Sequence, residues 1–149
     1  MRIEHIIEIA APVARVWELT LDVESWPRMT PTVTRVEWLS AQPIGIGSMA
    51  RIKQPAQGAK IWTVTALEPE RCLAWSTRSM GLTMTGTHQL TATETGTTNT
   101  LWIDLEGPLA WIVGTLFGRL IRNALRTENE GFKAAAEHDR FGAGRFGAG

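Results

Sequence analysis

The longest pattern of apolar and polar positions in this chain lies near its C-terminus. From Leu109 to Arg140, apolar residues recur in steps of three and four, the spacing of one face of an α-helix. Pro108 suits the first turn of such a helix, because its missing N–H needs no intrahelical partner there. The expected apolar face comprises Leu109, Ile112, Val113, Leu116, Phe117, Leu120, Ile121, Ala124 and Leu125. The first half of this helix is too apolar to stand alone, so we expect the rest of the chain to cover it.

Most of the preceding chain has a period of two, which is typical of β-strands. Ile3–Ile9 alternates as a half-buried strand, and a helix is expected over 13–21. Asp22 can cap a second short helix that Pro27 ends. Six further strands are predicted at Val33–Leu39, Ser48–Gln54, Lys60–Leu67, Cys72–Thr77, Thr83–Thr91 and Thr98–Glu106. Short turn-rich connections make neighbouring strands antiparallel, so we expect an α+β fold in which a sheet wraps around one long helix.

Composition narrows the classes of protein to consider. The chain has 149 residues, and its 15 basic residues balance its 15 acidic ones, which gives no electrostatic footprint for nucleic acid. The single cysteine, Cys72, cannot form an internal disulfide, so a reducing, cytoplasmic setting is expected. The most apolar window, Leu109 to Leu125, is too short to be a transmembrane segment, and the N-terminus does not resemble a signal peptide. We expect one domain over 1–140 and a flexible glycine-rich tail over 141–149, which repeats Arg-Phe-Gly-Ala-Gly.

Several short motifs occur in an order that resembles a known superfamily. They are Ile7–Pro12 followed by Val16-Trp17, then Asp22–Pro27, Gly45–Ser48, Trp62–Thr65, Leu67–Pro69, Trp75 and Gly107-Pro108. Over about residues 1 to 138, these motifs resemble the START-like, or Bet v 1-like (SRPBCC), superfamily, and most closely its bacterial polyketide cyclase/dehydrase-like branch. The resemblance implies a helix-grip fold, in which a seven-stranded antiparallel sheet curves around the C-terminal helix and leaves an apolar cavity. Members include lipid carriers, hormone receptors and aromatic cyclases without one shared catalytic motif, so we assign no catalytic residue.

The alternation within each strand predicts which side chains face the cavity. Arg35 and Glu37 mark the outer face of their strand. Thr34, Val36 and Trp38 are therefore expected inside. The same argument, continued through the other strands and the long helix, selects the candidate ligand-binding residues Trp38, Gln54, Trp62, Trp75, Met84, His88, Trp111, Phe117 and Ile121.

His88 is the most informative of these candidates. An inward-facing histidine can orient a ligand, act as an acid or base, or be a neutral core residue bonded to the backbone, and the sequence leaves all three open. His5 has the same alternatives, with the core role favoured near a chain end. Gln54 is a second polar candidate, and Gly86 either leaves room beside a ligand or marks a bulge.

Three functions are compatible with these features. The first is a protein that encloses a small apolar molecule, such as a lipid, a polyketide or an aromatic metabolite. The second is a polyketide cyclase/dehydrase-like enzyme, and the third is a structural or interaction protein whose cavity the seven tryptophans fill. Nucleotide-binding and metal-binding motifs are absent from the sequence, so no cofactor is expected. Gly114 and Gly118 have a G-x-x-x-G spacing. The favoured interpretation is that the helix passes close to the sheet there, and a homodimer through this face is the alternative.

Overall fold

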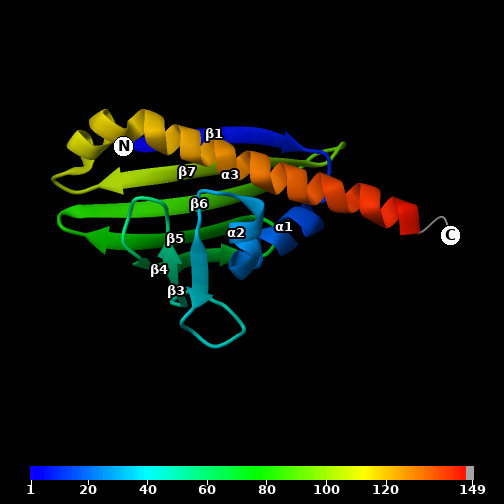
Figure 1. Cartoon of the computed structure of the whole chain (residues 1–149), viewed down its shortest axis with the longest axis horizontal. Coiled ribbons are helices and arrows are strands. Elements are labelled where there is room, and N and C mark those ends of the chain that lie inside the picture. The colour runs from blue at the N-terminus through cyan, green and yellow to red at the C-terminus, as the bar shows by residue number, and fades with distance from the viewer. Residues whose placement is uncertain (147–149) are drawn as a thin grey trace.

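A curved antiparallel sheet forms one layer of the molecule and a single long helix forms the other (Figure 1). This computed structural model describes the backbone of residues 1–146 and the side chains up to His138. The strands are β1 (Arg2–Ile9), β2 (Arg35–Trp38), β3 (Met49–Lys53), β4 (Lys60–Glu68), β5 (Cys72–Ser79), β6 (Leu82–Ala92) and β7 (Thr97–Glu106). Their order in the sheet is β1-β7-β6-β5-β4-β3-β2. β1 therefore lies at one edge beside β7, and β2 lies at the other edge. From β2 to β7, each strand pairs with the next strand in the sequence. The predicted helix-grip fold is confirmed.

Three short helical segments connect β1 to β2. They are α1 (Val13–Leu21), the 3-10 turn η1 (Val23–Ser25) and α2 (Trp26–Met29). The prediction that Pro27 ends a helix is wrong, because Pro27 lies in the first turn of α2, where its missing N–H costs nothing. The indole Nε1 of Trp26 donates a hydrogen bond to the carbonyl of Leu19 over 3.1 Å. This bond fixes α2 against α1 and directs the Trp26 ring into the core.

The inner face of the sheet holds the main core. Val36, Ala50, Trp62 and Trp75 are buried there, as their alternation predicts. Thr34 is exposed, which corrects its expected inward position. The physical reason is that β2 begins only at Arg35, so the strand alternation does not extend to Thr34.

The long helix α3 (Ala110–Phe146) crosses the same face of the sheet. In its first half only one side is covered: Ala110 is buried, and Val113 and Ile121 pack against β1 and β7 residues. The expectation that the whole apolar face would be covered is wrong, since Leu109, Ile112, Leu116, Phe117 and Leu120 are 41–69% exposed. Their positions spread around more of the helix than one buried face can accommodate.

The two glycines of the G-x-x-x-G pair lie on the covered side of α3. A Cβ atom at Gly114 would collide with the side chain of Met1, and one at Gly118 would lie 3.8 Å from Ile3. Gly114 therefore leaves room for the Met1 side chain against α3, whereas a Cβ at Gly118 would make only an ordinary contact with Ile3. A homodimer remains a prediction that these contacts leave untested.

The predicted tail over 141–149 overlaps the end of this helix. The α3 backbone continues past Arg140 to Phe146, whereas residues 147–149 and the side chains beyond His138 lie outside the described part of the chain. The flexibility of this tail stays a prediction. Within the described residues, no helix is both long and apolar enough to cross a bilayer.

Candidate functional site

A small cavity lies between the middle of the sheet and α3. Its volume is about 60 Å³, and Gln54, Trp62, Trp75, His88, Leu125 and Glu128 are among the residues that line it. Strand alternation predicted four of these residues: Gln54, which follows β3, and Trp62, Trp75 and His88 on β4, β5 and β6. The structure thus brings residues far apart in the sequence to one cavity.

Several tryptophan rings cluster at this cavity, and Trp26, Trp62 and Trp75 line it. Trp75 lies edge-on to Trp26 with ring centroids 5.3 Å apart, and 6.2 Å separates it from both Trp62 and Trp38. A Cβ at Gly86 would make an ordinary 3.5 Å contact with the Trp75 indole nitrogen, and it would lie 3.3 Å from Cδ1 of Ile103, which would have to move slightly. The β5–β6 register is continuous across Gly86, so this glycine marks no bulge between these strands.

A carboxyl group and an imidazole meet at one end of the cavity. Oε1 of Glu128 lies 3.5 Å from Nε2 of His88, and their side chains are only 13% and 5% exposed. Burial raises the pKa of Glu128 to about 7, although a 3.4 Å hydrogen bond from the Thr32 hydroxyl opposes the shift. Burial lowers the pKa of His88 to about 3. The pair therefore consists of a neutral imidazole beside a carboxyl that can exchange a proton near neutral pH.

Two polar atoms of the cavity residues have no hydrogen-bond partner among the described residues. They are Nδ1 of His88 and Nε1 of Trp62, both inaccessible to solvent. An unpaired buried polar group costs roughly 1–3 kcal/mol. His88 and Trp62 both line the cavity, so a bound molecule that bonded with either group would offset this cost.

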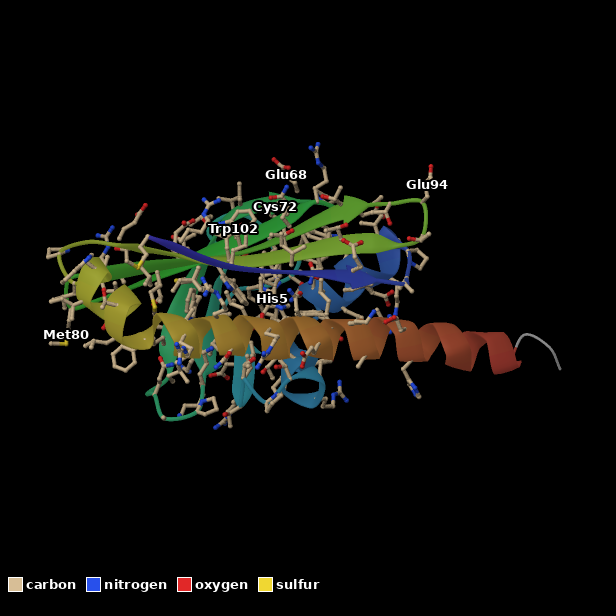
Figure 2. All side chains as sticks on the ribbon, turned by 90° about the horizontal axis from the view of Figure 1, so that it is seen from above. His5, Glu68, Cys72, Met80, Glu94 and Trp102 are labelled. Carbon is tan, nitrogen blue, oxygen red and sulfur yellow. The ribbon has the colours of Figure 1, made fainter. Side chains whose placement is uncertain are left out.

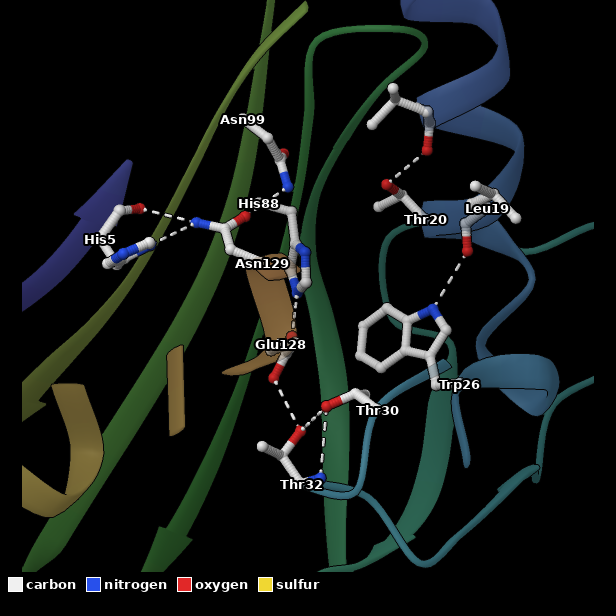
Figure 3. A network of polar contacts seen from close by, with 11 residues as sticks. His5, Leu19, Thr20, Trp26, Thr30, Thr32, His88, Asn99, Glu128 and Asn129 are labelled. Carbon is white, nitrogen blue, oxygen red and sulfur yellow. Dashed lines mark hydrogen bonds and ion pairs between the residues drawn. The ribbon is translucent and has the colours of Figure 1, made fainter. Parts of the chain in front are cut away.

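A buried amide network holds Glu128 at this site (Figure 3). The next residue on α3, Asn129, donates to the ring Nδ1 and the carbonyl oxygen of His5 at 2.9 and 3.1 Å. Asn129 also accepts a 2.8 Å hydrogen bond from Asn99 on β7. Asn99 and Asn129 are completely buried. The network fixes the rotation of α3 against β1 and β7, so that Glu128 faces His88.

A wider groove lies beside this cavity. Its volume is about 450 Å³, and it runs between the turn at Pro55–Gln57 and the α3 residues Leu120, Ala124 and Thr127. Gln54 lines both spaces, and Thr32 of the groove donates to Glu128 of the cavity. The groove and the cavity are therefore neighbours that share Gln54 and are linked by the hydrogen bond from Thr32 to Glu128.

The predicted ligand-binding residues fall into three groups. Gln54, Trp62, Trp75 and His88 line the cavity together. Trp38 and Met84 are half-buried and pack against the main core, and Ile121 packs in the smaller core under α3. Trp111 and Phe117 are 70% and 49% exposed on the outside of α3, and neither lines the cavity or the groove.

Sequence reasoning missed Thr32, Glu128 and Asn129. Glu128 and Asn129 lie three and four residues after Leu125, and four and three residues before Phe132. Leu125 and Phe132 are buried, so helical periodicity places both polar residues on the buried face. Polar residues within an apolar helical stripe were the available signal. The position of Thr32, in a loop before β2, had no comparable signal.

Several solved protein structures have a fold similar to this one. The hypothetical protein jhp0584 from Helicobacter pylori has a TM-score of 0.79 at 10% identity, and the match covers 91% of this chain and 88% of that one. A START superfamily protein from Mycobacterium smegmatis has a TM-score of 0.71 at 17% identity, with 90% and 97% covered. The di-domain ARO/CYC protein StfQ from the steffimycin biosynthetic pathway has a TM-score of 0.76 at 15% identity, with 93% of this chain and 52% of StfQ covered. At these identities the likeness shows the fold alone.

The sequence itself matches one family over most of its length. No curated protein matches this chain. The model of the family described as polyketide cyclase/dehydrase and lipid transport matches residues 1–137 of the 149. The match spans every strand and all of α3 that contacts the cavity. The chain therefore belongs to the polyketide cyclase/dehydrase and lipid transport family.

Proposed function

We propose that this protein binds a small, mostly apolar molecule whose uncharged polar head occupies the cavity and whose apolar body lies in the groove. The observation that carries the proposal is the pair of unpartnered buried groups, Nε1 of Trp62 and Nδ1 of His88, at the wall of one cavity. Family membership supports a ligand-binding role, since the family description includes lipid transport. The cytoplasmic setting expected from the lone cysteine stays a prediction.

The chemistry of the cavity favours a neutral oxygen on the ligand. The Trp62 N–H can only donate, so its partner must accept a hydrogen bond. His88 is neutral and Glu128 is close to half-protonated at neutral pH, so no fixed positive charge is present to stabilise a buried anion. A carbonyl or hydroxyl group meets these requirements, and a carboxylate does not.

The volumes of the two spaces favour a binding mode in which the head group of the ligand lies in the cavity and its apolar body lies in the groove. Pockets for drug-sized ligands typically measure roughly 300–1,000 Å³, so a 60 Å³ cavity holds only a head group. The 450 Å³ groove is large enough for a ring system or an acyl segment, and Leu120, Ala124 and Pro55 supply apolar surface there.

A second candidate function is a cyclase or dehydratase acting on a polyketide-like substrate. The Glu128–His88 pair specifically favours this alternative, because an acid with a pKa of about 7 can both donate and accept a proton. In such a reaction the tryptophan wall would hold the folded substrate, and Glu128 would exchange a proton with its carbonyl or hydroxyl oxygen. The third alternative, a core filled by tryptophans, predicts that no ligand binds.

The test begins with native mass spectrometry of gently purified protein and identification of any molecule released on denaturation. A fluorescence titration then compares 2-naphthol with 2-naphthoate, which share a ring system but differ in charge at neutral pH. The proposal expects the naphthol to bind at least about tenfold more tightly. Trp62→Phe should weaken naphthol binding about fivefold, the value of one lost hydrogen bond, and the control Trp111→Phe should not.

Two results would contradict the binding proposal. One is equal affinity for the two probes, and the other is a wild-type protein that purifies empty and binds neither. Turnover of a poly-β-ketone thioester that His88→Ala and Glu128→Gln both abolish would establish the enzyme instead.

A further inference from the structure

The largest unexplained feature of the surface is an apolar stripe on the outside of α3. Leu109, Ile112, Leu116 and Leu120 form this outer stripe, with exposed fractions of 41%, 47%, 69% and 66%. Their spacing of three, four and four residues places them along one line of the helix, facing away from the sheet. Exposed apolar rows of this kind mark interaction sites in folded proteins.

The surroundings of the outer stripe are basic. From Ala110 to Thr127, α3 carries Arg119, Arg122 and Arg126 and no acidic residue. All three arginines are exposed on the helix. The chain as a whole has no net charge, so this positive charge is a local feature of the helix.

Large apolar side chains adjoin the stripe at the entry to the helix. Trp111 is 70% exposed on the first turn of α3. Met80, at the tip of the β5–β6 hairpin, is 90% exposed, and the hairpin touches the start of α3 through a 3.3 Å hydrogen bond from Leu109 N–H to the Gly81 carbonyl. Figure 2 places Met80 beside this end of the helix. The hairpin tip and the outer stripe therefore form one continuous apolar surface.

We propose that this surface docks on an anionic lipid bilayer, with the outer stripe and Met80 in the interfacial region and the arginines at the lipid phosphates. A helix with an apolar face and flanking arginines binds such interfaces in its own plane without spanning them. Each arginine near an anionic surface strengthens binding, because the surface potential is negative. The docking of the helix does not depend on which molecule the cavity binds.

A second copy of the chain fits this surface less well. A two-fold interface would lay the same patch on itself, so the arginines of both copies would approach each other. No carboxylate on this part of α3 could compensate for them. Lipid phosphates supply the missing negative charge.

Docking would also place the groove where it can exchange an apolar ligand. Leu120 belongs both to the outer stripe and to the wall of the groove, and Asn123 and Thr127 continue along the same side of the helix. The groove therefore begins where the stripe ends. A molecule leaving the bilayer would meet apolar surface from the stripe to the groove.

The test is flotation of the full chain with phosphatidylcholine vesicles, with and without phosphatidylglycerol. We expect binding that requires phosphatidylglycerol and falls as salt rises. The double variant Ile112→Ser, Leu116→Ser should bind at least about tenfold more weakly. A matched control, Met49→Ser, Ile61→Ser, removes residues that are 42% and 47% exposed on the opposite face of the sheet and should bind like wild type.

Arg122→Gln provides a second variant that leaves the apolar surface intact, and it should weaken vesicle binding about fivefold. Wild-type protein that floats with neither vesicle would overturn the proposal, as would stripe variants that bind like wild type. Light scattering that shows a dimer lost in the Ile112→Ser, Leu116→Ser variant would assign the surface to a second copy instead.

Discussion

The two halves of α3 reverse the usual relation between hydrophobicity and burial. The first half contains Leu116 and Leu120, which are 69% and 66% exposed. The second half contains Asn129, which is fully buried, and Glu128, whose side chain is 13% exposed. Hydrophobicity alone would assign the first half to the core and the second half to the surface. The difference indicates that position over the curved sheet decides burial.

Curvature of the sheet explains why the second half is enclosed. It lies against α1, α2 and the inner face of the sheet, so Phe132 and Ala136 are surrounded on all sides. Gly131 allows this close passage, because a Cβ there would collide with the carbonyl oxygen of Met29. The apolar residues of the first half pack with residues of β1, β6 and β7, and the outer side of this half stays exposed.

The largest expected effect comes from comparing one aromatic residue in each half. Phe132→Ala should lower the free energy of unfolding by about 3–5 kcal/mol, because Phe132 is completely buried beside Trp26 and His88. Phe117→Ala removes the same atoms from a side chain that is 49% exposed and should cost less than about 1 kcal/mol. Urea denaturation measures both. Equal losses would show that the first half of α3 is as tightly packed as the second.

The next effect concerns the pH dependence of stability. The pKa of Glu128 rises from 4.5 to about 7 on folding, so the folded chain binds more protons than the unfolded chain in this window. Stability from this group is therefore complete below pH 4.5 and is lost as pH rises through 7, by up to about 3 kcal/mol. Glu128→Gln should remove this contribution, so the unfolding free energy of wild type minus that of the variant, measured in urea, should fall by about 2–3 kcal/mol from pH 5 to pH 8, a difference in which the titration of His88 cancels.

His88 provides the internal control for that experiment. Its pKa falls from 6.5 to about 3, so its contribution is complete above pH 6.5 and is lost as pH falls through 3. The Glu128→Gln variant should therefore keep its loss of stability in acid while losing the dependence near pH 7. If the difference in unfolding free energy between wild type and variant were the same at pH 5 and pH 8, that result would contradict the raised pKa of Glu128.

The fold could be predicted from sequence because its strands and helices have strong local periods. The alternation in β3 to β6 correctly placed Trp62, Trp75 and His88 inside. The site was predicted only in part. Its carboxyl group, Glu128, comes from α3, and a helical pattern read from apolar residues alone treats a glutamate as a surface residue. Which side of α3 faces the sheet depends on contacts between β1, β7 and the helix, and these are not encoded locally.

Asn129 is the residue that fixes that rotation, and removing it has the smallest expected effect on stability. Asn129→Ala leaves the Asn99 amide and the His5 Nδ1 without their partner, which should cost about 1–3 kcal/mol in urea unfolding. Asn123→Ala, an exposed amide on the same helix, should change stability by less than about 0.5 kcal/mol.

A second measurement separates positioning from packing at Asn129. If the amide network holds Glu128 in the cavity, the Asn129→Ala variant should let that carboxyl reach water. The pKa of Glu128, followed by ¹³C NMR of its carboxyl carbon, should then fall from about 7 towards its usual value of 4.5. Loss of stability with an unchanged titration would mean that Asn129 only fills space. A shifted titration would show that one buried amide in the polar half of α3 sets the chemistry of the site.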